Sequence, residues 1–288
     1  SRLRRSRASG MPYCMKFSLV AVVIALLMVN VVQAQLSWSD LSQDEWSKLD
    51  IQTVAELIDN NGVDTPVLCI APSNWNDEPL ESCTPLAMIA KFNGSSELAS
   101  VLIDHGADPN ATDSAGFSVL NWACAQRDTT PELLRVLVDA GADVNYSGSR
   151  SGTPSLYISS YMSGDAEVLR VLIEAGADPN QSVSGYTPLL EAVGHQKPLD
   201  MIRTLVEAGA DVNARSDHTS VAGTFTVLTQ AITPYRISDA PQTDLEVVEF
   251  LLDSGADPNE AGRNLMPPLV LAAAERPDNS ELIQLLLQ

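Results

Sequence analysis

The segment PELLRVLVDAGADVN, residues 131–145, decides the fold because it returns almost unchanged as AEVLRVLIEAGADPN at residues 166–180. The apolar residues of each copy recur at spacings of three and four, which places them on one face of a helix. Gly141 and its counterpart then allow the helix to end in the left-handed conformation at little cost. Each copy is therefore predicted to be a helix with one face to bury, followed by a tight turn.

The Gly-Ala-Asp motif of this segment recurs along the chain with spacings of 35, 35, 33 and 46 residues. Recurrence close to 33 residues is typical of proteins built from stacked units. The low aromatic content of 5%, beside 45% hydrophobic residues, agrees with packing by small aliphatic side chains. The glycines of the five copies are Gly106, Gly141, Gly176, Gly209 and Gly255.

A second motif precedes the first in each unit, as CTPLAMIA at residues 83–90, GTPSLYIS at residues 152–159 and YTPLLEAV at residues 186–193. Thr followed by Pro is a helix start, because Thr can cap free amides and Pro gives up an N–H that has no partner there. Each unit is thus predicted to contain a short helix, a turn, a second helix and a glycine stop. Weaker copies of this motif begin at Phe117, Phe225 and Met266.

Together the two motifs resemble the ankyrin-repeat family, whose units read Gly-x-Thr-Pro-Leu-His-x-Ala-Ala, then a second helix, then Gly-Ala-Asp-Val-Asn. The resemblance covers residues 84–288 as six units. It implies an all-α solenoid of antiparallel helix pairs joined by hairpin-like loops, which binds another protein on its concave groove and hairpin tips. The family's His is absent, so we expect its hydrogen bonds to be replaced or lost. The equivalent positions hold Ala87, Asn121, Leu156, Leu190, Thr229 and Val270.

The remaining domain boundaries follow from the chain on either side of these units. Residues 35–83 are predicted to form an N-terminal half-repeat cap with an inserted loop, in which Trp38 and Trp46 cover the end of the stack. At the other end, Gln288 falls within the last predicted helix, so we expect a truncated final unit.

Residues 15–34 have the layout of a secretory signal peptide, with one Lys, an apolar run and a small-residue cleavage pattern. The alternative is an uncleaved membrane anchor, but the run is shorter than the roughly 20 residues that a spanning helix needs. We therefore expect an exported protein, periplasmic or secreted. Residues 1–14 are interpreted as upstream read-through.

The charge balance limits the kind of partner. The net charge is −20, and removal of residues 1–34 takes away five basic residues and no acidic one, which gives −25. Such a surface repels phosphate backbones and anionic membranes, so nucleic acid and membrane contact beyond the signal segment are not expected. A protein partner with a basic surface fits better, although the acidity also suits simple solubility. We expect the chain to be monomeric.

No catalytic, cofactor or metal motif stands out. The three histidines are His105, His195 and His218, and no two of them have the spacing of metal ligands. We therefore predict no enzyme activity, no cofactor and no metal. The Asn-x-Ser/Thr strings at Asn110, Asn145 and Asn180 match glycan acceptors but use the recurring Asn of the hairpin.

The cysteines suggest one disulfide. Cys69 and Cys83 flank the inserted loop, and in an exported protein their pairing would contribute about 3 kcal/mol in the chain-entropy model. Cys124 replaces a small buried Ala of the family, and we interpret it as core filler.

The predicted partner-binding residues come from two positions that recur once per unit. The residue just before the Thr position supplies Phe117, Tyr186 and Phe225. The fourth residue after the Thr position supplies Trp122 and Tyr157. If these aromatics anchor a partner, Trp122→Ala and Tyr157→Ala should each weaken binding by more than about 1 kcal/mol and leave the melting temperature nearly unchanged.

Two alternatives remain open. The aromatics could instead pack between units, in which case the binding surface would be the long hairpin around His218. The protein could also be an inhibitor or immunity-type protein that blocks one exported enzyme, since such a protein would use the same surface.

Overall fold

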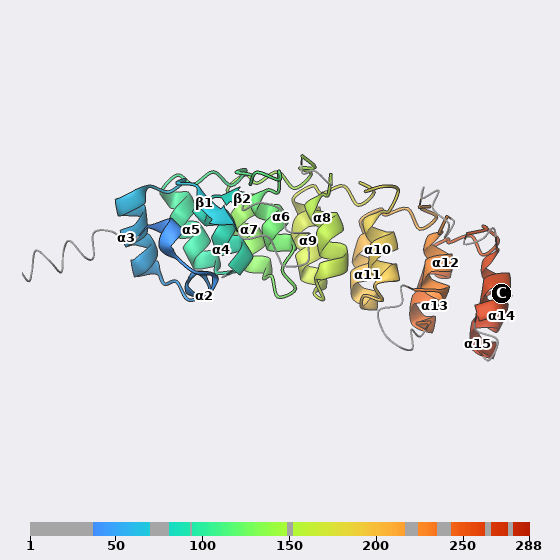
Figure 1. Ribbon diagram of the computed structural model, residues 1–288. Helices are drawn as coiled ribbons and strands as arrows, with labels where there is room; N and C mark the ends of the chain where they lie inside the picture. The colour runs from blue at the N-terminus through green and yellow to red at the C-terminus, as the bar shows by residue number, and fades with distance from the viewer. Residues whose placement is uncertain are drawn as a thin grey trace, which may run out of the picture.

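The computed structural model is an elongated stack of helix pairs with the two ends of the described chain at opposite ends of the stack (Figure 1). It describes residues 37–69, 81–92, 94–148, 152–216, 224–234, 243–262, 266–275 and 279–288. The predicted signal segment, the upstream read-through and the hairpin around His218 lie outside these residues. Within them, no helix has the length and apolar character needed to cross a membrane.

Six units each contribute two antiparallel helices, and the helices form two rows. Each first helix packs on the first helix of the next unit, and most second helices pack likewise on the next second helix. The all-α solenoid is therefore confirmed. The first helices are α4 (Pro85–Phe92), α6 (Val119–Cys124), α8 (Ser155–Met162), α10 (Pro188–Gly194), α12 (Val227–Ile232) and α14 (Pro268–Glu275). The second helices are α5 (Ser96–Asp104), α7 (Pro131–Asp139), α9 (Ala166–Glu174), α11 (Leu199–Glu207), α13 (Leu245–Asp253) and α15 (Ser280–Leu285).

The N-terminal end is closed by a 3-10 helix η1 (Trp38–Asp40), a short helix α2 (Gln43–Trp46) and a longer helix α3 (Ile51–Asn61). Helix α3 packs on α5, in the second row, while α2 packs on α4, in the first row. The rings of Trp38 and Trp46 are buried and stacked, with centroids 5.5 Å apart. The cap thus has a short first helix in addition to the second helix that the sequence predicts.

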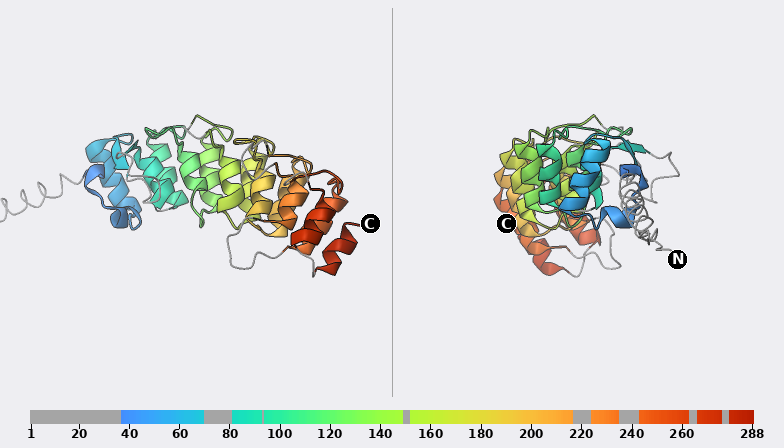
Figure 2. Two further views of the ribbon diagram at one scale, coloured as in Figure 1. Left: turned by 45° about the vertical axis from the view of Figure 1, so that its right-hand side comes forward. Right: turned by 90° about the vertical axis from the view of Figure 1, so that its left-hand side faces the viewer.

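A two-stranded antiparallel sheet joins the cap to the first full unit. Strands β1 (Val67–Cys69) and β2 (Glu81–Cys83) pair with Val67 opposite Cys83, and the two strands lie at one side of the stack in the end-on view of Figure 2. Cys83 is disulfide-bonded. The side chain of Cys69 lies outside the part of the chain that the structure describes, so the pairing of Cys69 with Cys83 stays a prediction.

The recurring Gly-Ala-Asp-x-Asn motif forms a hydrogen-bonded clamp between successive units. The side-chain amide of Asn145 donates to the carbonyl oxygen of Gly176 at 2.8 Å and accepts from the backbone N–H of Asp178 at 2.9 Å. Asp143 in turn accepts from the backbone N–H of Asn145 at 3.0 Å, which holds the Asn in place. The same clamp is made by Asn110, Asn180 and Asn213. The amide nitrogens of the glycan-like strings are therefore occupied by contacts between units.

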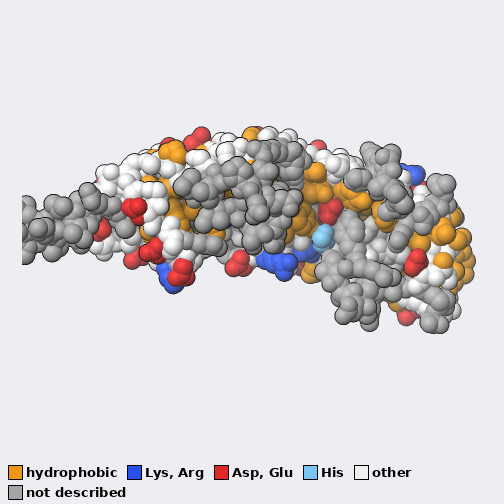
Figure 3. Space-filling view, viewed as in Figure 1, with side chains coloured by type: hydrophobic (Ala, Val, Ile, Leu, Met, Phe, Trp, Pro, Cys, Tyr) orange, Lys and Arg blue, Asp and Glu red, His pale blue; other side chains and the backbone are white. Residues whose placement is uncertain are grey.

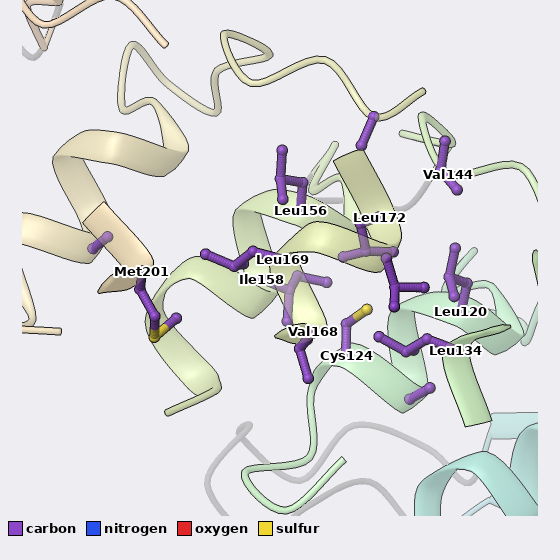
Figure 4. Packing of buried hydrophobic residues seen from close by; sticks show 14 of the residues in the cluster. Leu120, Cys124, Leu134, Val144, Leu156, Ile158, Val168, Leu169, Leu172 and Met201 are labelled. Carbon is purple, nitrogen blue, oxygen red and sulfur yellow. The ribbon is translucent and has the colours of Figure 1, made fainter. Parts of the chain in front are cut away.

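The core between the two rows is aliphatic, as Figure 4 shows around Leu120, Leu169 and Leu172. Cys124 is fully buried among these residues, and burial raises the pKa of its thiol to about 12. The missing family His is replaced in one unit by Asn121, whose side-chain amide donates to the carbonyl oxygen of Thr153 in the next unit at 3.2 Å.

Candidate partner-binding site

The first helices carry two lines of side chains on one side, which we call the first-helix face, and in the first line only Tyr157 is not buried. The fourth residue after each Thr position and the residue one turn later lie on the same side of a helix. On the side of the stack seen in Figure 3, hydrophobic side chains gather along the molecule, and a group of Lys and Arg side chains lies at the lower margin near the middle. The two rows of the first-helix face are Met88, Trp122, Tyr157, Glu191, Gln230 and Leu271, then Phe92, Gln126, Tyr161 and His195.

The first group on this face is the Trp122 cluster, made of Lys91, Phe92, Asp113, Phe117 and Trp122. The Trp122 side chain is only 8% exposed, and its Nε1–H donates to Asp113 Oδ2 at 3.0 Å. The Lys91 ammonium lies 3.9 Å from the centroid of the Trp122 ring, and the Phe117 ring lies 5.4 Å from it. The indole is therefore enclosed by an acid, a cation and a second ring.

This burial contradicts the expectation that Trp122→Ala would leave the melting temperature nearly unchanged. Truncation would leave a cavity where the ring now packs and would remove the hydrogen bond to Asp113. A role of Trp122 in binding stays a prediction, but its structural role is now evident. Lys91 and Asp113 were not singled out from the sequence, because they come from the preceding first helix and from a hairpin.

The second group is the Tyr157 cluster, made of Tyr157, Tyr161, Tyr186, Glu191 and His195. The Tyr157 hydroxyl donates to Glu191 Oε1 at 2.9 Å, and His195 Nε2 lies 3.2 Å from Glu191 Oε2. The Tyr157 and Tyr161 rings meet edge to face at 5.8 Å, and Tyr161 stacks on the His195 ring at 5.5 Å. The tyrosines and the histidine are half-buried, whereas Glu191 is 8% exposed.

The Glu191 carboxylate affects the pKa values of the neighbouring tyrosines. Burial, and then the charge of Glu191, raise the pKa of the Tyr157 hydroxyl, with smaller contributions from Tyr161 and Tyr186. The same two causes raise the pKa of Tyr161. Both phenols therefore stay protonated at any physiological pH, and they offer neutral rings and hydroxyl groups beside a buried negative charge.

The five predicted binding residues fall into two classes. Trp122 and Phe225 are buried, each 8% exposed, and the N–H of Phe225 donates to the Ser216 hydroxyl at 2.8 Å. Phe117, Tyr157 and Tyr186 are half-buried. The structure brings Phe117 to Trp122 and Tyr186 near Tyr157, but the described contacts do not join all five into one surface.

Two residues of the Tyr157 cluster escaped the sequence analysis as binding candidates. Tyr161 follows Tyr157 by four residues, and His195 follows Glu191 by four, so helical spacing was the signal that could have found them. His195 is the C-cap residue of α10 and lies in the turn that follows this helix. Among the residues that the structure describes, no group of three His, Cys, Asp or Glu is placed to hold a metal ion.

Comparison with known proteins settles the family. The family model described as ankyrin repeats (3 copies) matches residues 47–148 and 132–216, more than half of the chain. The chain belongs to the ankyrin-repeat family. Its repeats are protein–protein interaction modules, and the ankyrin fold is typically a scaffold without enzyme activity. The match also begins inside the predicted N-terminal cap, upstream of residue 84.

A solved structure supports the same assignment. The ankyrin repeat domain of Bcl-3, described as a unique member of the IkappaB protein family, is similar to this ankyrin stack with 27% sequence identity and a TM-score of 0.56. The similarity covers 71% of this chain and 82% of that chain. A search of curated proteins found no match.

Proposed function

We propose that this ankyrin stack binds one partner protein through its first-helix face, outside the cytoplasm and without catalysing a reaction. The observation that carries the proposal is the Tyr157 cluster, where half-exposed aromatic rings are held in fixed positions. Tyr157 is held by its hydrogen bond to Glu191, and Tyr161 by stacking on His195. Rigid aromatic side chains are favoured anchors at protein interfaces because they bury a large area at a small cost in conformational entropy.

The charge of the chain supports a partner with a basic surface. A net charge of −20 speeds encounter with cationic proteins and slows encounter with anionic ones. The predicted signal segment at residues 15–34 supports a location outside the cytoplasm.

Site-specific photo-crosslinking tests the binding face. A photoreactive phenylalanine derivative replaces Tyr161 on the first-helix face or, as the control, the exposed Glu174 on α9. In extracytoplasmic extract of the source organism, we expect the Tyr161 variant to form a covalent product with one protein and the Glu174 variant to form none. Equal products from both variants, or none from Tyr161, would contradict the proposed face.

The same preparation tests location and role. N-terminal sequencing of the exported protein should begin near Gln35, whereas retention of residues 15–34 would indicate an uncleaved anchor. If the captured partner is an enzyme whose activity falls when the purified stack is added, the protein is an inhibitor rather than a scaffold.

A further inference from the structure

The sequence position that places a cation over Trp122 holds an uncharged residue in the unit that precedes Tyr157. Lys91 is the seventh residue after its Thr position, and its ammonium lies over the ring of the next unit, at Trp122. The equivalent positions in the next three units hold Ala125, Ser160 and Gly194. Among the described residues, no Lys or Arg lies over the ring of Tyr157 or Tyr161. Within the described residues, the ankyrin stack thus places a cation of its own over one aromatic of the row and none over the next.

Tyr157 lies beside a buried negative charge. Glu191 is 8% exposed and accepts a hydrogen bond from the neutral Tyr157 hydroxyl. Within the described part of the chain, its one ion-pair partner within 4 Å is His195. A carboxylate has about four acceptor sites, so these two neighbours leave further capacity. A buried carboxylate without a strong cation partner attracts positive charge more effectively than an exposed one, because solvent screens it less.

We propose that the Tyr157 cluster is a subsite for one cationic side chain, Arg or Lys, of the partner protein. The cation lies against the rings of Tyr157 and Tyr161 and is attracted by the Glu191 charge, as Lys91 is attracted to Trp122. The phenols take part as neutral groups, and their π faces favour a cation. This inference rests on the proposed function, since the subsite is part of the first-helix face.

Two basic residues lie nearby and limit which charge can bind. The Lys197 ammonium donates to the Ser163 carbonyl oxygen at 2.7 Å, at the end of α8. Burial, and then the charge of Arg127, lower the pKa of Lys197. An anionic group of the partner would bind near Lys197 and Arg127 instead of near Glu191. The titration described below therefore includes an anionic probe.

The experiment is an NMR titration of the full chain with four small probes. Nα-acetyl-arginine amide and Nα-acetyl-lysine amide carry the cation, Nα-acetyl-citrulline amide is the neutral match for arginine, and Nα-acetyl-glutamate amide is the anion. We expect the ring signals of Tyr157 and Tyr161 to shift with a cationic probe, and binding of citrulline to be about tenfold weaker than that of arginine. Equal binding of arginine and citrulline, tighter binding of the anion, or no shift of either ring would overturn the proposal.

Two variants sharpen the result. Glu191→Gln keeps the shape of the side chain and removes its charge, and we expect it to weaken binding of the cation by a factor of about five. Glu174→Gln removes one charge from an exposed position on α9 and should leave binding unchanged. If Glu191→Gln does not fold, the comparison of arginine with citrulline on the unaltered chain still decides. A negative titration with persisting crosslinks at Tyr161 would reject the subsite and retain the binding face.

Discussion

Trp122 and Tyr157 occupy the same position in neighbouring units, but their surroundings differ. Trp122 has Lys91 above its ring and Asp113 at its Nε1, and it is buried. At Tyr157, Ala125 takes the place of Lys91 and Gly148 takes the place of Asp113, and the ring stays half-exposed. The comparison teaches that an aromatic in a repeat array becomes core or surface according to the preceding unit and its own hairpin.

The largest expected effect is a loss in the free energy of unfolding when a residue of the Trp122 cluster is truncated. Trp122→Ala should lower the free energy of unfolding by about 3 to 5 kcal/mol, because it empties a well-packed site and leaves Asp113 without its indole donor. Urea unfolding followed by circular dichroism measures this difference. A loss below 1 kcal/mol would show that Trp122 is not core, and it would remove the distinction between the clusters.

A smaller effect is expected in the Tyr157 cluster. Tyr157→Phe removes the hydroxyl that donates to Glu191 and should cost about 1 kcal/mol, less than is usual for a bond to a charged acceptor because the ring is half-exposed. The matched control is Tyr161→Phe, which keeps the ring contacts with Tyr157 and His195. The same unfolding measurement should find a smaller loss for the control, and an equal loss would show that the bond to Glu191 contributes nothing specific.

The smallest effect is a response to alkaline pH. Burial and the Glu191 charge raise the pKa values of Tyr157 and Tyr161 in the folded state, while the unfolded chain has tyrosine pKa values of about 10. Above that pH the unfolded state loses protons that the folded state keeps. The contribution of the two protonated tyrosines to the free energy of unfolding is therefore fully present below about pH 10 and declines as the pH rises.

Unfolding experiments at pH 9 and pH 11 test this linkage. The unaltered chain should lose more stability between the two values than Tyr157→Phe does, because the variant lacks one of the two shifted phenols. Identical losses would mean that Tyr157 titrates alike in both states, and that its ring is as exposed as in the unfolded chain.

Much of the fold follows from the sequence, because the fold depends on features that repeat. The glycine spacing and the Thr-Pro helix starts predict six helix pairs, and the structure has two helices in each of these six units. The candidate site was less predictable. Its residues lie in one row, but their burial depends on single neighbours such as Lys91 and Asp113, which do not repeat. Contacts made once in an array leave no periodic signal, so position alone could not separate Trp122 from Tyr157.

The asparagine clamp has a consequence for how this chain tolerates changes in length. Asn213 reaches Gly255 and Asp257 at 3.0 and 2.8 Å, although the fifth unit is longer than its neighbours. Asn145 makes the same pair of bonds across an ordinary unit at 2.8 and 2.9 Å. The clamp contacts only backbone groups of the next Gly and Asp. Residues can therefore be inserted between two clamps without altering the hydrogen bonds that join the units. New loops can therefore be acquired in evolution while the stacking of the units is conserved.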